Sequence, residues 1–103
     1  MNTNHINTDN EAEMISAFVD AGMYCTGAET AEALKDDNMT WMNADDLADA
    51  LDWDKQTIGG VMRSLQRKGL IVDSGEPGPR GFTYLHDFFA SDEAIDWYFG
   101  EGK

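Results

Sequence analysis

The 103-residue chain has a single cysteine, two prolines and no long hydrophobic run. Cys25 has no second cysteine with which to form an internal disulfide. We therefore expect an intracellular, cytoplasmic protein with a buried or idle thiol here rather than a nucleophile. No apolar stretch approaches the roughly 20 residues of a membrane span, and the polar residues 1–4 lack signal-peptide character. These absences predict a soluble protein that folds around one core without disulfides or metal.

Residue types that carry catalysis or bind metals are also scarce. The two histidines, His5 and His86, have no cysteine or second histidine at metal-ligand spacing, and no phosphate-binding loop or nucleophile motif is present. The paired aspartates at 36–37 and 45–46 are expected at helix ends. Solvation and the helix dipole account for such pairs better than acid–base catalysis does. The sequence favours a protein that is not an enzyme and has no cofactor.

Basic residues are few, and their distribution is uneven. Seven Lys and Arg stand against twenty Asp and Glu, which gives this acidic protein a net charge of −13. Residues 55–80 contain five bases and two acids, so this segment has a charge of +3 and the rest of the chain −16. The overall charge repels nucleic acid, whereas the local excess favours contact with phosphate. Bases near a helix C-terminus also stabilise the helix dipole, which leaves a purely structural interpretation open.

The N-terminal part of the chain predicts two helices after a flexible segment, residues 1–7. Thr8 and Glu11 have the spacing of a capping box, and apolar residues at helical spacing follow for several turns. Residues 28–35 are rich in Ala and Glu and predict a short second helix. Residues 39–42 then predict a short extended segment that pairs with the edge of a hairpin.

Residues 43–68 predict two helices joined by a three-residue turn, 52–54. Asn43 and Asp54 are suited to cap these helices at their N-termini. The second helix carries one stripe of apolar residues at helical spacing: Ile58, Val61, Met62 and Leu65. Gly69 is expected to end it in the left-handed conformation that glycine adopts most readily.

The opposite face of the second helix has a different character. It presents four residues at helical spacing: Gln56, Gly60, Arg63 and Arg67. Two of them are cations, and the amide of Gln56 is able to read adenine. The adjacent glycines, Gly59 and Gly60, cost about 1 kcal/mol each relative to alanine inside a helix. Close approach to a DNA backbone or to a neighbouring helix would each account for that cost.

A β-hairpin, called the wing below, is predicted at residues 70–85. Residues 70–73 form a short apolar strand, 74–81 are dense in Pro and Gly, and 82–85 alternate as a returning strand. Arg80 at the tip is placed to reach the minor groove or a phosphate, or to stay solvated.

Residues 87–99 are predicted to form a C-terminal helix, followed by a tail at 100–103. This helix carries many aromatic residues, whose surface must be buried. Two arrangements would bury it: packing on the first helix, or a homodimer seam between two chains. Residues 8–99 as a whole are expected to form one domain, mainly α with a small β-hairpin.

Two patterns carry a resemblance to a known family. They are Leu-Ala-x-x-Leu at 47–51 and Leu-Gln-Arg-Lys-Gly-Leu-Ile at 65–71. With these patterns, residues 43–86 resemble the winged helix-turn-helix superfamily of microbial and phage transcription regulators. The resemblance implies a winged helix-turn-helix with additional N- and C-terminal helices, and DNA contacts from the second helix and the wing. The residues implied as DNA contacts are Lys55, Gln56, Thr57, Gly60, Arg63, Ser64, Arg67 and Arg80.

Two functions of different classes follow. In the first, the protein is a sequence-specific DNA-binding regulator of transcription whose partner is duplex DNA. In the second, the winged helix serves as an acidic protein-interaction module, which binds a basic protein partner or imitates DNA as a phage-encoded inhibitor. The basic stripe favours the first function, and the charge of −16 on the remaining residues favours the second.

Overall fold

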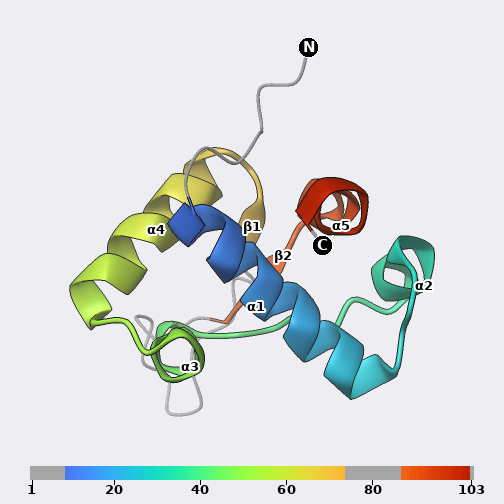
Figure 1. Cartoon of the computed structure of the whole chain (residues 1–103), viewed down its shortest axis with the longest axis horizontal. Coiled ribbons are helices and arrows are strands. Elements are labelled where there is room, and N and C mark those ends of the chain that lie inside the picture. The colour runs from blue at the N-terminus through green and yellow to red at the C-terminus, as the bar shows by residue number, and fades with distance from the viewer. Residues whose placement is uncertain (1–8, 74–86, 103) are drawn as a thin grey trace.

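Helices make up most of the computed structural model, which describes residues 9–73 and 87–102 (Figure 1). In chain order the elements are α1 (Asp9–Thr26), α2 (Ala31–Asp36), α3 (Ala44–Leu51), α4 (Lys55–Arg67), β1 (Ile71–Asp73), β2 (Phe88–Ala90), α5 (Asp92–Trp97) and the π-helical turn η2 (Tyr98–Gly102). α1 crosses the middle of the molecule, with α3 and α4 on one side of it and α2 and α5 on the other. The predicted class, mainly α with a small antiparallel sheet, is confirmed.

α1 provides much of the core. Met14, Ile15, Phe18 and Val19 are fully buried on one face of this helix, which packs against α3, α4 and β2. Cys25, for which the sequence predicted a buried or idle thiol, is exposed near the end of α1. None of the helices in the described residues is long and apolar enough to span a bilayer.

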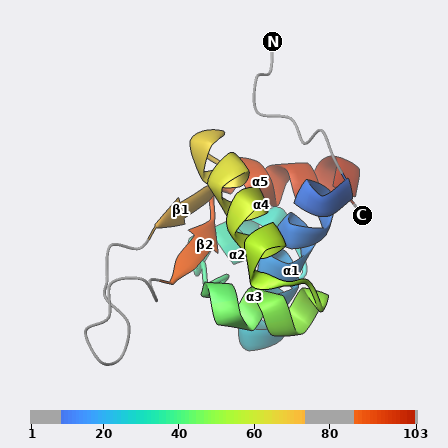
Figure 2. The ribbon, with the colours of Figure 1, turned by 90° about the vertical axis from the view of Figure 1, so that its left-hand side faces the viewer.

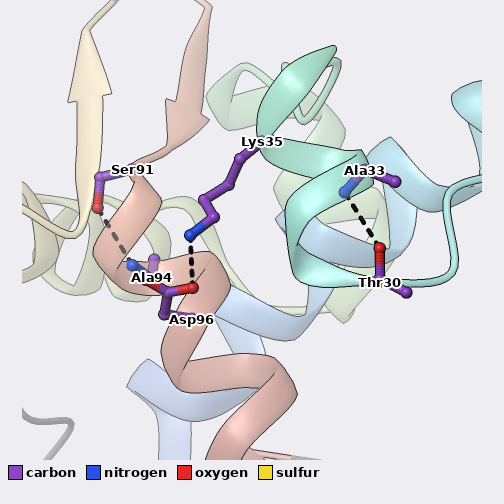
Figure 3. Close-up of polar contacts among 6 residues, drawn as sticks. All are labelled: Thr30, Ala33, Lys35, Ser91, Ala94 and Asp96. Atoms are coloured by element: carbon purple, nitrogen blue, oxygen red, sulfur yellow. Dashed lines mark hydrogen bonds and ion pairs between the residues drawn. The ribbon is translucent and has the colours of Figure 1, made fainter.

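α2 and α5 pack against each other and are joined by an ion pair (Figure 3). Lys35 Nζ donates a hydrogen bond to Asp96 Oδ1 over 2.7 Å. This hydrogen bond raises the pKa of Lys35 above its ordinary value. The side-chain oxygens of Thr30 and Ser91 each accept a backbone N–H from the first turn of their own helix, and so cap α2 and α5.

The small sheet has two strands and one additional bridge. β1 and β2 pair antiparallel, with Val72 opposite Phe89, and lie side by side at one edge of the molecule (Figure 2). On the other side of β2, Met42 and Phe88 exchange two backbone hydrogen bonds of 2.9 Å. The extended segment predicted at 39–42 therefore does pair with the hairpin, through Met42.

The strand that pairs with β1 differs from the prediction. We expected the returning strand at 82–85 and a helix over 87–99. Instead, the strand β2 occupies Phe88–Ala90, and α5 begins only at Asp92. Two adjacent phenylalanines suit a half-buried strand, and Ser91 supplies the cap at which the helix starts. Residues 74–86, which include the predicted turn and returning strand, lie outside the described residues, as does the segment 1–7.

The aromatic residues at the end of α5 and the start of η2 pack on the core of the monomer. Trp97, Tyr98 and Phe99 are half-buried there, and η2 contacts α1. The Tyr98 hydroxyl donates to Asp20 Oδ1 over 3.3 Å. Desolvation, followed by the charge of Asp20, raises the pKa of Tyr98. These contacts match the first arrangement predicted for this segment, and the homodimer stays a prediction. Helical structure continues through Gly102, into the segment predicted as a tail.

A capping box starts α3 and so orients the helix that precedes α4. Asn43 Oδ1 accepts the N–H of Asp46 over 2.8 Å, and the Asp46 carboxylate accepts the N–H of Asn43 over 3.3 Å. Each side chain thus satisfies a backbone donor that the first helical turn leaves without a partner.

We expect Asn43→Ala to lower the free energy of unfolding by about 1 kcal/mol, because the first turn of α3 loses this acceptor. Urea denaturation followed by circular dichroism measures the change. Asp49→Ala, an exposed position in the same helix, is the control and should have little effect. Equal losses for the two variants would contradict a specific role for the cap.

Candidate nucleic-acid interface

α4 has one buried face and one exposed face. Ile58, Met62 and Leu65 are buried, and the helix packs against α1 and α3. Val61, the other member of the predicted stripe, is half-buried. The opposite face presents the four predicted residues, all exposed: Gln56, Gly60, Arg63 and Arg67. Their helical spacing places them along a single line, which we call the arginine line.

The two cations of the arginine line are available to a ligand. Arg63 and Arg67 are exposed and lie about one helical turn apart, roughly 6 Å along the axis. Neither forms an ion pair with any acid in the described part of the chain. A guanidinium group presents a rigid fork of donors that matches phosphate oxygens. The arrangement is therefore able to bind a phosphate backbone.

Packing among the described residues does not require the glycines of α4. A Cβ added at Gly60 would meet no atom of the described residues within 4 Å, and the same holds for Gly59. Both residues have negative φ, unlike Gly69, whose φ of +76° confirms the predicted left-handed end of the helix. A neighbouring helix among the described elements therefore does not account for the glycines.

The N-terminal end of α4 carries carboxylates as well as a lysine. Asp54 Oδ1 accepts the N–H of Thr57 over 2.7 Å, and this hydrogen bond lowers the pKa of Asp54. The stability that this cap contributes is present above the ordinary pKa of aspartate and is lost as pH falls through the lowered value. Lys55 Nζ lies 3.2 Å from a carboxylate oxygen of Asp45. Lys55 and Thr57 thus lie beside groups that repel phosphate, so they are weaker candidates for DNA contacts than the arginines.

Ser64, one of the predicted DNA contacts, forms a side-chain hydrogen bond within the chain. The Ser64 hydroxyl donates to Glu11 Oε2 over 2.6 Å. Lys68 Nζ donates to both carboxylate oxygens of Glu11, over 2.9 and 3.0 Å. Glu11 belongs to α1 and is only 5% exposed, so this cluster holds α1 against α4. Ser64 therefore has a structural contact of its own. Lys68 is one of the five bases that give segment 55–80 its positive charge, and it is paired with Glu11. Arg63 and Arg67 are then the two cations of α4 without an ion pair to a described carboxylate.

The sequence contains one signal for this cluster. Glu11 precedes Ile15 and Phe18 at helical spacing, which places a carboxylate on the apolar face of α1. A buried carboxylate needs partners, because its desolvation is costly without them. The partners are 53 and 57 residues away along the chain, so local spacing does not identify them. Thr8, with which Glu11 was predicted to form a capping box, lies outside the described residues.

We expect Lys68→Met to lower the free energy of unfolding by about 2 kcal/mol, because the buried Glu11 loses its ion pair with this lysine. Chemical denaturation at neutral pH measures the loss. Combining Lys68→Met with Glu11→Gln removes both charges and keeps an acceptor for Ser64, so it should recover much of the stability. A double variant whose loss equals the sum of the two single losses would contradict the pairing.

Arg80, predicted at the tip of the wing, lies outside the described residues. In the part of the chain that the structure describes, no three His, Cys, Asp or Glu side chains are grouped so as to hold a metal ion. Comparisons with protein-family models, curated proteins and solved structures found no match for the chain. The function is therefore inferred from the side chains of α4 and their surroundings.

Proposed function

We propose that the protein is a winged helix-turn-helix DNA-binding protein that regulates transcription. In this proposal α3 and α4 form the helix-turn-helix, and β1 and β2 form the base of the wing. The short turn between α3 and α4 supports it, as does the pairing of β1, which follows α4, with a later antiparallel strand. The resemblance of residues 43–86 to winged helix-turn-helix regulators agrees with this order of elements.

The observation that carries the proposal is the arginine line on the exposed face of α4. The major groove of DNA is about 12 Å wide and admits an α-helix. Arg63 and Arg67 would bind phosphates and set the position of the helix, and Gln56 would pair with the edge of an adenine. Gly60 lies between Gln56 and Arg63 and has no side chain, which lets the helix axis approach the DNA closely.

The acidic remainder of the chain gives this proposal a physical consequence. Non-specific binding to DNA is almost entirely electrostatic, and the net charge of −13 opposes it. A protein of this kind would hold DNA mainly where the arginine line fits and where base contacts add to the phosphate contacts. The body of the protein would thus disfavour DNA that lacks the correct sequence.

Fluorescence anisotropy of a labelled duplex of random sequence tests the proposal. We expect binding at low salt, with a slope of log K against log salt of about −2, because each of two phosphate contacts contributes roughly −0.9. Selection from a pool of random duplexes should then enrich a defined site that binds more tightly at moderate salt. No binding at low salt together with no enrichment would refute the proposal.

A further inference from the structure

An open groove runs over α1 and against the end of α3, away from the arginine line. Ala12, Ala17 and Ala21 of α1 line it together with Leu51 of α3. The carboxylates of Glu13 and Asp20 also stand along it. The groove thus combines an apolar floor with negative charge.

The length and the small side chains of the groove suit a helix. Its lining on α1 extends from Ala12 to Tyr24, about 18 Å along the helix axis at 1.5 Å per residue. Helices pack with axes about 8–10 Å apart, and small residues at the contact permit the closer end of that range. A small-molecule site would bury most of its ligand and fix it with a few enclosed polar groups. Here the acidic side chains are exposed instead.

An exposed aromatic residue lies at the end of the groove. Tyr24 is 91% exposed, the largest exposed fraction among the large hydrophobic residues of the described chain. Tyrosine is enriched among the residues that contribute most to protein interfaces. Tyr24 is therefore suited to anchor a partner that lies along α1.

Charge selects the partner. Glu13 and Asp20 are exposed, and no lysine or arginine of the described residues lines the groove. A second copy of this chain would bring its own charge of −13 and be repelled. We propose that the groove along α1 binds a basic amphipathic helix of another protein. This inference uses no residue of the arginine line, so it stands or fails separately from DNA binding.

A designed peptide tests the inference on the full chain. The probe is a labelled peptide of about 18 residues, with leucine on one helical face and lysine on the other, which spans the groove. We expect it to bind more tightly than a scrambled peptide of the same composition and than a Leu/Glu version. Glu13→Arg should weaken binding roughly fivefold, and Ala50→Phe, which fills the groove from an exposed position on α3, by about tenfold.

Matched variants outside the groove separate this site from general attraction to an acidic protein. Glu29→Arg makes the same change of charge, and Ala33→Phe adds the same bulk at an exposed position on α2; both should bind the peptide as the wild type does. Asp20 is left unchanged because Tyr98 donates to it. Equal weakening by groove and control variants, or equal binding of the scrambled peptide, would overturn the inference. Loss of duplex binding in Arg63→Ala with Arg67→Ala should leave peptide binding intact.

Discussion

Replacing Arg63 and Arg67 together by alanine should weaken duplex binding by about tenfold or more and should remove most of its dependence on salt. The reason is that these are the two cations of α4 that no described carboxylate neutralises. When a phosphate contact is lost, fewer counterions are released from the DNA on binding. The slope of log K against log salt should therefore fall towards zero. Anisotropy titrations at several salt concentrations measure both quantities.

Lys35→Gln is the control for the loss of positive charge. It removes one cation from α2, on the side of α1 away from α4 (Figure 1), and should change duplex binding far less than Arg67→Gln. Equal effects of these two single variants would show that the DNA responds to net charge alone. The arginine line would then have no special role.

Two substitutions of Gly60 should have different effects, one on the stability of the protein and the other on DNA binding. Gly60→Ala should raise the free energy of unfolding by up to about 1 kcal/mol, because the helix gains a better helix former and the new Cβ meets open space. Gly60→Phe should weaken duplex binding by about tenfold, since its ring would hold the helix off the groove floor. Thermal unfolding and anisotropy measure the two effects.

Gly59 is the matched control for Gly60. It is the adjacent residue and lies off the arginine line. Gly59 is half-buried, but a Cβ added there would also meet no described atom within 4 Å. Gly59→Ala should therefore stabilise the helix by a similar amount, up to about 1 kcal/mol, and Gly59→Phe should affect duplex binding much less than Gly60→Phe. If Gly60→Phe bound DNA as tightly as the wild type, α4 would not be the helix that enters the groove.

The helices with strong local signals could be predicted from the sequence. α3 and α4 begin at their predicted caps, Asn43 and Asp54, and the left-handed Gly69 follows the C-cap of α4. Caps, apolar spacing and glycine conformation all act over a few residues, so the local sequence contains the information. The exposed face of α4 followed from the same periodicity.

Features that depend on distant contacts were missed. β2 forms where we expected a helix, because its backbone pairs with β1 and with Met42 far away in the chain. Ser64 was predicted only as a DNA contact, and its hydrogen bond to a glutamate 53 residues earlier was not foreseen. No local pattern specifies such partners, since they depend on how α1 packs against α4. Sequence periodicity thus identified the exposed face of α4. The packing of α1 against α4 determines which nearby side chains, such as Ser64 and Lys68, are already bonded within the chain.

The chemical shifts of backbone amides, followed as a duplex selected from the random pool is added, test DNA binding by α4 most directly. We expect the largest changes along α4 between Gln56 and Arg67, with smaller ones in α3, the first helix of the proposed helix-turn-helix. Changes confined to the acidic residues of α3, or to the groove along α1, would contradict the docking of α4 in the major groove. An unchanged spectrum at low salt would contradict DNA binding altogether.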